Sequence, residues 1–188
     1  IHRYPLKTLR KEIQPVSPAV YMQFLFDWQG LTEPGEGVEA LLGVLQQLEG
    51  CAVPAGAWEK DILPARLRGY MGHELDQLCN SGQILWLHPN HPRKRKAAPL
   101  STTNIVLLER STASFWMKPA DTEEALEQLS SPARRLLVSL QQQGAQFFID
   151  LVRSSGMLRT QVEDALAELV ATGWITSDNY TGLRALLM

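Results

Sequence analysis

The sequence is poor in cysteine, and its two thiols form no metal-binding or disulfide pattern. Cys51 and Cys79 lie far apart in the 188-residue chain, at no spacing that metal ligands use. Small disulfide-stabilised domains carry many more cysteines for their length, so that class is excluded. We predict that both thiols are reduced and buried, as in a cytoplasmic protein.

The sequence also lacks an excess of charge of one sign and any long apolar run. Its formal net charge is −2, so contact with nucleic acid would have to depend on local rather than total charge. No run is as long as a membrane span, and no signal peptide is present, so no membrane partner is expected. The chain starts at Ile1 and stops soon after an apolar run, and we expect it to be a fragment of a longer polypeptide.

Residues that could form a catalytic or metal site are sparse. The sequence has no phosphate-binding glycine loop and no Cys/His cluster at metal spacing. His88 and His91 lie in a proline-rich loop, where no carboxylate or thiol completes a site. Glu123 and Glu124 fall in an acidic stretch that favours solubility. We therefore predict that this chain has no catalytic residue, no metal and no cofactor.

Most of the chain has the hydrophobic periodicity of helices. Ser17 followed by Pro18 is typical of a helix start, because serine caps the first turn and proline is tolerated at the first helical position. Pro64 lies inside one predicted helix, so a kink or break is expected there. Gly82 is typical of a helix end. Helices are predicted over residues 3–13, 19–29, 38–48, 54–68 and 73–80.

The pattern changes after Gly82, where two strand-like runs flank a polar loop. Residues 83–87 alternate, and residues 104–108 are apolar and rich in β-formers. We predict that the two runs pair antiparallel and that residues 115–117 add a strand. A helix, a strand, a loop and a second strand follow one another in this order in a winged-helix domain. The loop carries four consecutive cations, which are Arg93, Lys94, Arg95 and Lys96.

A second unit with the same order is predicted after an acidic linker at residues 119–130. Ser131 before Pro132 is predicted to cap its first helix, and Thr160 is predicted to cap its long helix over residues 161–171. A strand is predicted to begin at residues 174–177. The fold class is thus α+β, mostly α, with tandem winged-helix domains. We divide the chain into N-terminal helices at 1–37, a winged-helix domain with a basic wing at 38–118 and a second winged-helix domain with a truncated wing at 131–188.

The four cations at 93–96 are the clearest candidates for contact with DNA. A basic loop between strands can reach phosphates and release counterions, which positions a protein on DNA without reading its sequence. The alternative is a solvated loop tip with no partner. The helix at 73–80 offers a mixed signal, because the acid Glu74 accompanies His73 and Gln77.

Three further residues are candidates for contact with DNA. Arg159 and Thr160 lie outside the apolar stripe of the long second-unit helix, although Glu163 and Asp164 on that helix oppose phosphate and favour a scaffold role. Aromatic side chains can stack on bases, but most of the five tryptophans are expected in the core. Trp28 is the exception, because it ends a helix beside a Gly/Pro loop.

Several separate motifs resemble one family of proteins. They are FLFDWQ at residues 24–29, AGAWEKDILPAR at 55–66, LDQLCNSGQILW at 75–86 and, in the second unit, the run from Leu136 through Phe147-Phe148 and Asp150-Leu151 to residues 161–169. On these motifs the chain resembles, over nearly its whole length, the bacterial large helicase-related proteins, Lhr.

The resemblance implies a fold and a role. Full-length members are DNA-repair helicases with an ATP-driven motor in the N-terminal half. Their C-terminal half has tandem winged helices and a β-barrel, and it resembles the AlkZ-type DNA glycosylases. No motor motif occurs here, so ATP and Mg²⁺ are expected to bind in the parent and not in this chain. The resemblance implies cytoplasmic, non-catalytic modules that hold single-stranded or forked DNA through its phosphates, beside other domains of the parent helicase.

Two alternatives stay open. The first is a protein–protein or oligomerisation module of the same helicase without direct DNA contact, with a homo-oligomer as one form of it. The net acidity and the acids of the second-unit helix favour this alternative. The second is an active glycosylase, which is less favoured because no residue pattern that would activate a water is visible.

Overall fold

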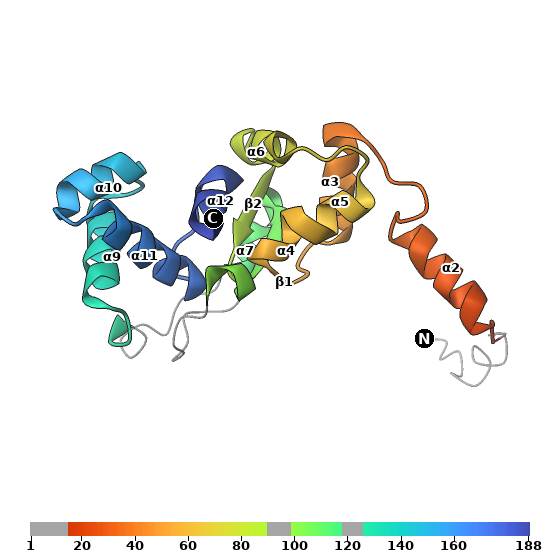
Figure 1. Ribbon diagram of the computed structural model, residues 1–188, viewed down its shortest axis with the longest axis horizontal. Coiled ribbons are helices and arrows are strands. Elements are labelled where there is room, and N and C mark those ends of the chain that lie inside the picture. The colour runs from red at the N-terminus through yellow and green to blue at the C-terminus, as the bar shows by residue number, and fades with distance from the viewer. Residues whose placement is uncertain (1–14, 90–98, 118–125) are drawn as a thin grey trace, which may run out of the picture.

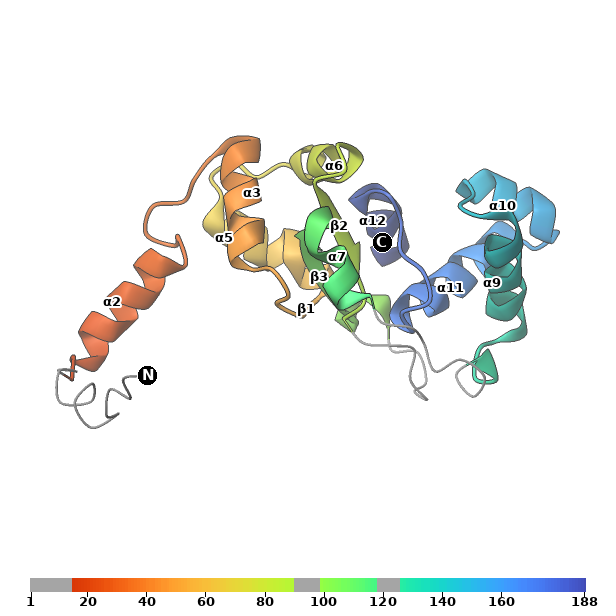
Figure 2. The ribbon, with the colours of Figure 1, turned by 180° about the vertical axis from the view of Figure 1, so that it is seen from behind.

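A small sheet surrounded by helices lies at the centre of an elongated molecule. The computed structural model describes residues 15–89, 99–117 and 126–188. One helix, α2 (Pro18–Trp28), stands apart at one end, and three helices of the second unit lie at the other end (Figure 1; Figure 2). Among the described helices, none is both long and apolar enough to cross a membrane. The helix predicted at residues 3–13 lies outside the described residues.

The sheet has three antiparallel strands, β1 (Val53–Pro54), β2 (Ile84–Leu87) and β3 (Asn104–Glu109), in the order β1-β3-β2. Trp86 of β2 lies opposite Leu107 of β3, so the predicted hairpin is confirmed. The two faces of the sheet belong to different apolar clusters, because side chains alternate along a strand. Ile84, Trp86, Ile105 and Leu107 face the main core, and Leu85, Leu87, Val106 and Leu108 face a smaller cluster with Ala113.

The helices of the first unit complete the main core. They are α3 (Gly37–Gln47), the pair α4 (Ala55–Ala57) and α5 (Leu63–Arg66), and α6 (Gly72–Asn80). The break expected near Pro64 is confirmed, and a π-helical segment, η1 (Trp58–Ile62), separates α4 from α5. Within it the N–H of Leu63 bonds to the carbonyl of Trp58, a wider turn than in an α-helix.

The strand predicted at residues 115–117 is wrong. Ala113–Trp116 form a short helix, α7, whose aromatic side chains resembled a strand pattern. The Trp116 ring covers Gly50, where a Cβ atom would lie 2.2 Å from the ring. Gly50 also has a φ of +75°, so both the backbone conformation and the close approach require glycine.

The second unit has three helices with their own apolar core, α9 (Ser131–Gln143), α10 (Phe148–Ser155) and α11 (Arg159–Ala171). The cap of α9 is Ser130 and not Ser131, because the Ser130 hydroxyl accepts from the Ala133 N–H at 3.3 Å. Glu168 of α11 accepts from the Ser130 N–H at 2.8 Å and so ties the two helices together.

Two further predictions about the second unit are wrong. The helix α11 begins at Arg159 with Leu158 as its cap residue, so Thr160 is not the cap. The side chain of Gln161 accepts from the Leu158 N–H at 3.1 Å, which satisfies the helix start without a hydroxyl. The strand predicted at 174–177 is irregular chain, and helix α12 (Tyr180–Leu187) follows it. The described part of the second unit therefore contains no strand.

Helix α12 follows the second unit but packs on the first. Tyr180 and Leu183 are buried in the main core. The Tyr180 hydroxyl donates to the carbonyl of Ala55 at 3.1 Å, and the Trp86 indole donates to the carbonyl of Asn179 at 3.0 Å. The division of the chain at residues 119–130 stays a prediction, and these contacts add that the last helix belongs to the core of the first unit.

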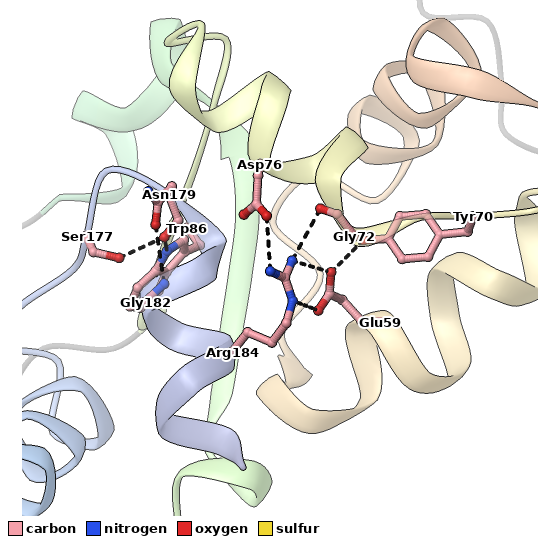
Figure 3. Close-up of polar contacts among 9 residues, drawn as sticks. All are labelled: Glu59, Tyr70, Gly72, Asp76, Trp86, Ser177, Asn179, Gly182 and Arg184. Carbon is pink, nitrogen blue, oxygen red and sulfur yellow. Dashed lines mark hydrogen bonds and ion pairs between the residues drawn. The ribbon is translucent and has the colours of Figure 1, made fainter.

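A half-buried ionic cluster fixes α12 in place (Figure 3). The Arg184 guanidinium bonds to both carboxylate oxygens of Glu59, at 2.7 and 2.8 Å, and to Asp76 at 3.0 Å. It also donates to the carbonyl of Gly72 at 3.2 Å, and the Tyr70 hydroxyl donates to Glu59 at 2.7 Å. The hydrogen bonds to Glu59 raise the pKa of Arg184. One side chain thus joins η1, α6 and α12.

Replacing Arg184 by methionine should destabilise the fold strongly, because it leaves Glu59 and Asp76 without their cation. These carboxylate side chains are only 20% and 18% exposed, so we expect a loss of about 2–3 kcal/mol in the free energy of unfolding. The matched control is Arg159→Met, because Arg159 pairs with Glu163 at 3.0 Å but is 75% exposed. That change should cost less than about 1 kcal/mol. Equal losses in urea unfolding of the two variants would refute the structural role of the Arg184 cluster.

The two cysteines differ in environment. Cys79 is buried in the main core, as predicted, whereas Cys51 is exposed, so the prediction that both are buried is wrong. Burial is the main cause that raises the pKa of Cys79 to about 12, and the charge of Asp76 adds to it.

The native protein should therefore show one reactive thiol. With a thiol reagent near pH 8, Cys51 should react rapidly, and Cys79 should react only after unfolding in denaturant. A Cys51→Ser variant is the control and should show no fast reaction. If a second thiol per native protein molecule also reacted rapidly, Cys79 would be accessible, which would mean that α6 separates readily from the core.

Candidate nucleic-acid interface

The helix α6 and the β2–β3 hairpin form one continuous unit. The chain leaves α6 through a turn at Gly82, where φ is +75°, and enters β2 two residues later. Before α6 come α3, β1 and the interrupted helix formed by α4, η1 and α5. The whole series has the element order of a winged helix, in which α6 takes the position of the recognition helix and the β2–β3 loop that of the wing.

Opposite faces of α6 have different chemistry. Leu75, Leu78 and Cys79 point into the main core. His73, Gln77 and Asn80 are exposed, and their spacing of four and three residues places them along one side of the helix. We call these three residues the α6 strip. The strip carries amide and imidazole groups, which can donate and accept hydrogen bonds.

The two acids of α6 do not lie on the α6 strip. The carboxylate of Glu74 accepts from the Met71 N–H at 3.0 Å and so caps the start of the helix. The carboxylate of Asp76 is paired with Arg184 at 3.0 Å (Figure 3). Each negative charge is therefore engaged within the fold, and the exposed strip is free of carboxylates.

The structure describes the two ends of the basic loop. Arg93, Lys94, Arg95 and Lys96 lie outside the described residues. The chain leaves β2 at Leu87 and returns through a 3-10 turn at Leu100–Thr102 to β3. In this turn the Thr103 hydroxyl donates to the carbonyl of Pro99 at 3.2 Å. Because α6 and β2 are consecutive and in contact, the loop leaves the sheet from the strand next to the recognition helix.

The tryptophans divide between core and surface. Trp58 and Trp86 are 0% and 1% exposed, so they cannot stack on a ligand. Trp28 is 62% exposed at the end of α2, and the ring of Phe24 is stacked on it at a centroid distance of 6.1 Å. Trp28 is thus exposed as expected, but Trp116, which was expected in the core with the other tryptophans, is also 37% exposed.

Arg159 and Thr160 are both exposed at the start of α11. The Arg159 guanidinium pairs with Glu163 and also lies over the Phe148 ring, 5.2 Å from its centroid. The structure does not gather the predicted contacts on one surface. Helix α2, with Trp28, is at one end of the molecule, α6 is near the centre and the second-unit helices are at the other end (Figure 1).

Sequence reasoning missed two residues that shape this surface. Asn80 shares a face with Gln77, and helical spacing could have revealed it. Arg184 engages Asp76 from a helix 108 residues away, and no local pattern in the sequence predicts such a contact. Over the described ranges, no group of three or more His, Cys, Asp or Glu side chains could hold a metal ion.

Comparison with known proteins identifies the family. Residues 16–110 match the model of the winged-helix domain of the large helicase-related protein. The chain is 30% identical over 192 residues to the Lhr helicase/probable uracil glycosylase of Mycolicibacterium smegmatis, covering 100% of this chain and 12% of that protein. It is 30% identical over 205 residues to the Lhr helicase/uracil glycosylase of Escherichia coli, covering 96% of this chain and 13% of that protein.

The matched region contains the elements that carry the candidate interface. It begins just before α2 and ends just after β3, so α6, the sheet and the basic loop all lie within it. The observed sheet order and the position of α6 agree with the matched domain type. This chain therefore belongs to the large helicase-related protein family, Lhr, and residues 16–110 form a winged-helix domain of that family.

Proposed function

We propose that this chain is a non-catalytic, DNA-holding module of an Lhr-type helicase. In this proposal, the α6 strip and the basic wing contact the phosphate backbone of DNA together and do not read its sequence. The observation that carries the proposal is that both acids of α6 are engaged within the fold, so its exposed strip carries no carboxylate.

Electrostatics supports α6 as a contact surface. A carboxylate facing DNA would be repelled by phosphates and would lose hydration on binding. On α6, Glu74 serves the helix start and Asp76 is held by Arg184. The His73, Gln77 and Asn80 side chains can hydrogen-bond to phosphate or sugar oxygens without such a cost.

The wing supplies the charge that α6 lacks. Four consecutive cations in a chain with a net charge of −2 concentrate positive potential in one place. Each Lys or Arg that neutralises a phosphate releases a counterion, which makes binding dependent on salt. Backbone contacts of this kind position a protein without sequence preference, which suits a helicase that acts along DNA.

The role in the whole protein follows from the family. Of the two relatives, one is named a helicase and uracil glycosylase and the other a helicase and probable uracil glycosylase, and this chain spans 12–13% of their lengths. We propose that ATP and Mg²⁺ bind in the motor of the parent, that any glycosylase chemistry also occurs outside this chain, and that the module holds single-stranded or forked DNA in the cytoplasm while neighbouring domains act.

Replacing Arg93 and Arg95 by glutamine should weaken DNA binding and make it less sensitive to salt. The logarithm of the binding constant should depend on the logarithm of salt concentration with a slope shallower by about 2, one unit for each lost phosphate contact. A salt titration with labelled duplex and forked DNA measures this slope.

The matched control for this experiment is the double variant Arg135→Gln and Arg153→Gln. It removes the same charge from exposed positions on α9 and α10. This control should bind DNA as the unaltered protein does, because local and not total charge governs the contact. Equal changes of slope in the two double variants would overturn the role of the wing.

Substituting Gln77 by glutamate should also weaken DNA binding, because it places a carboxylate on the α6 strip. We expect the affinity for DNA to fall about fivefold to tenfold, because the variant loses one hydrogen bond and gains one repulsive contact between a carboxylate and phosphate. The control is Gln142→Glu, which adds the same charge at an exposed position on α9. Unchanged binding by the Gln77 variant, measured by fluorescence anisotropy, would contradict contact through α6.

One observation favours a second function, a protein-interaction or oligomerisation module. Helix α2 has no buried residue, and it exposes apolar side chains on every side, including Val20, Met22 and Phe26. A helix that is apolar all round is normally covered by protein. In this alternative, α2 docks on a neighbouring domain or on a second copy of the chain. Docking on a second copy would give a molar mass that rises with protein concentration in light scattering.

A further inference from the structure

Helix α2 stands outside all three apolar clusters. None of its residues from Pro18 to Trp28 is buried, and both views show it apart from the other helices (Figure 1; Figure 2). Hydrogen bonds hold its C-terminal end to the first unit, from Gln47 to the carbonyl of Trp28 at 2.5 Å and from Arg66 to Gln29 at 2.6 Å. The helix therefore projects from an anchored end.

One side of α2 carries a row of stacked aromatic rings. Tyr21, Phe24 and Trp28 are three and four residues apart, so they lie along one face of the helix. The centroids of Tyr21 and Phe24 are 6.5 Å apart with their planes at 25°, and those of Phe24 and Trp28 are 6.1 Å apart at 26°. The three residues are 52%, 54% and 62% exposed. We call this row the aromatic ladder.

We propose that the aromatic ladder is a stacking platform for the bases of single-stranded nucleic acid. Unpaired bases offer flat faces, and aromatic side chains bind them by stacking with little preference for sequence. A row of near-parallel exposed rings can receive successive bases of one strand. The proposal goes beyond the α6 and wing contact, because α2 shares no residue with that surface.

The charge around the ladder fits a polyanion. Within α2, Asp27 is the sole carboxylate, and it accepts hydrogen bonds from Gln23 at 3.0 Å and Thr32 at 2.7 Å. The sequence that precedes α2 is basic, and its placement lies outside the described residues. Residues 1–14 contain one acid, Glu12, and four cations, which are Arg3, Lys7, Arg10 and Lys11. In the sequence these cations precede the aromatic residues, and single-strand binding combines basic and aromatic side chains.

The ladder can be tested by replacing one ring at a time. Phe24→Ala and Trp28→Ala should each weaken binding of a labelled oligothymidylate of roughly 20 nucleotides by about tenfold, the loss of one base–aromatic stack. Trp28→Phe should keep most of the affinity because it keeps a ring. Both alanine variants should unfold at the same temperature as the unaltered protein, since neither side chain is buried.

Phe26→Ala is the matched control. Phe26 lies on the other side of the same helix and is 44% exposed, so the change removes the same side chain from a similar environment outside the ladder. Single-strand affinity should be unchanged in this variant. Equal losses in the Phe24 and Phe26 variants, or no loss in either, would overturn the stacking platform. A loss of self-association in light scattering, with unchanged affinity for the oligonucleotide, would assign α2 to a protein partner instead.

The same measurements separate this inference from the proposed function. If the protein binds duplex DNA and the Phe24→Ala variant keeps its single-strand affinity, the ladder alone is overturned. Single-strand binding that requires Phe24 and Trp28, in a protein that does not bind duplex DNA, supports the ladder and overturns the α6 and wing contact. A protein that binds neither DNA overturns both.

Discussion

The bonds of Arg184 are the constraint on which the arrangement of the molecule depends. Its guanidinium joins Glu59 of η1 and Asp76 of α6 to the last helix, across 125 and 108 residues of sequence. The carboxylate side chains are only 20% and 18% exposed, so this cation offsets negative charges that the fold largely removes from water. Because α12 follows the second unit, the same contact also ties that unit to the main core.

The ionic cluster also decides what α6 presents to its surroundings. Counted along the sequence, α6 has two acids and a single histidine and would oppose phosphate. On the folded helix, one acid caps the helix start and the other belongs to the Arg184 cluster, so the exposed strip has no carboxylate. The distribution of charge over a helix surface, and not its sum, therefore determines which partner that helix can meet.

Local patterns predicted much of the fold. Apolar periodicity located α3, α6 and α9, and the break at Pro64 followed from the missing N–H of proline. The strands predicted at 115–117 and 174–177 were wrong, because short apolar and aromatic runs suit helix and strand alike and tertiary contacts decide between them. For the site, helical spacing predicted His73 and Gln77 as exposed, but the removal of Asp76 from that surface depended on Arg184, which no local pattern reveals.

The two proposed contact surfaces lie in different parts of the molecule and differ in chemistry. The α6 strip and the wing offer hydrogen bonds and charge, which suit the phosphates of a duplex or a strand alike. The aromatic ladder offers flat rings, which only unpaired bases can use. Hydrogen bonds from Gln47 and Arg66 join the end of α2 to the first unit, which also carries the α6 strip. A plain duplex can engage only the α6 strip and the wing, whereas a single strand, or DNA in which duplex and single strand meet, can engage both surfaces at once.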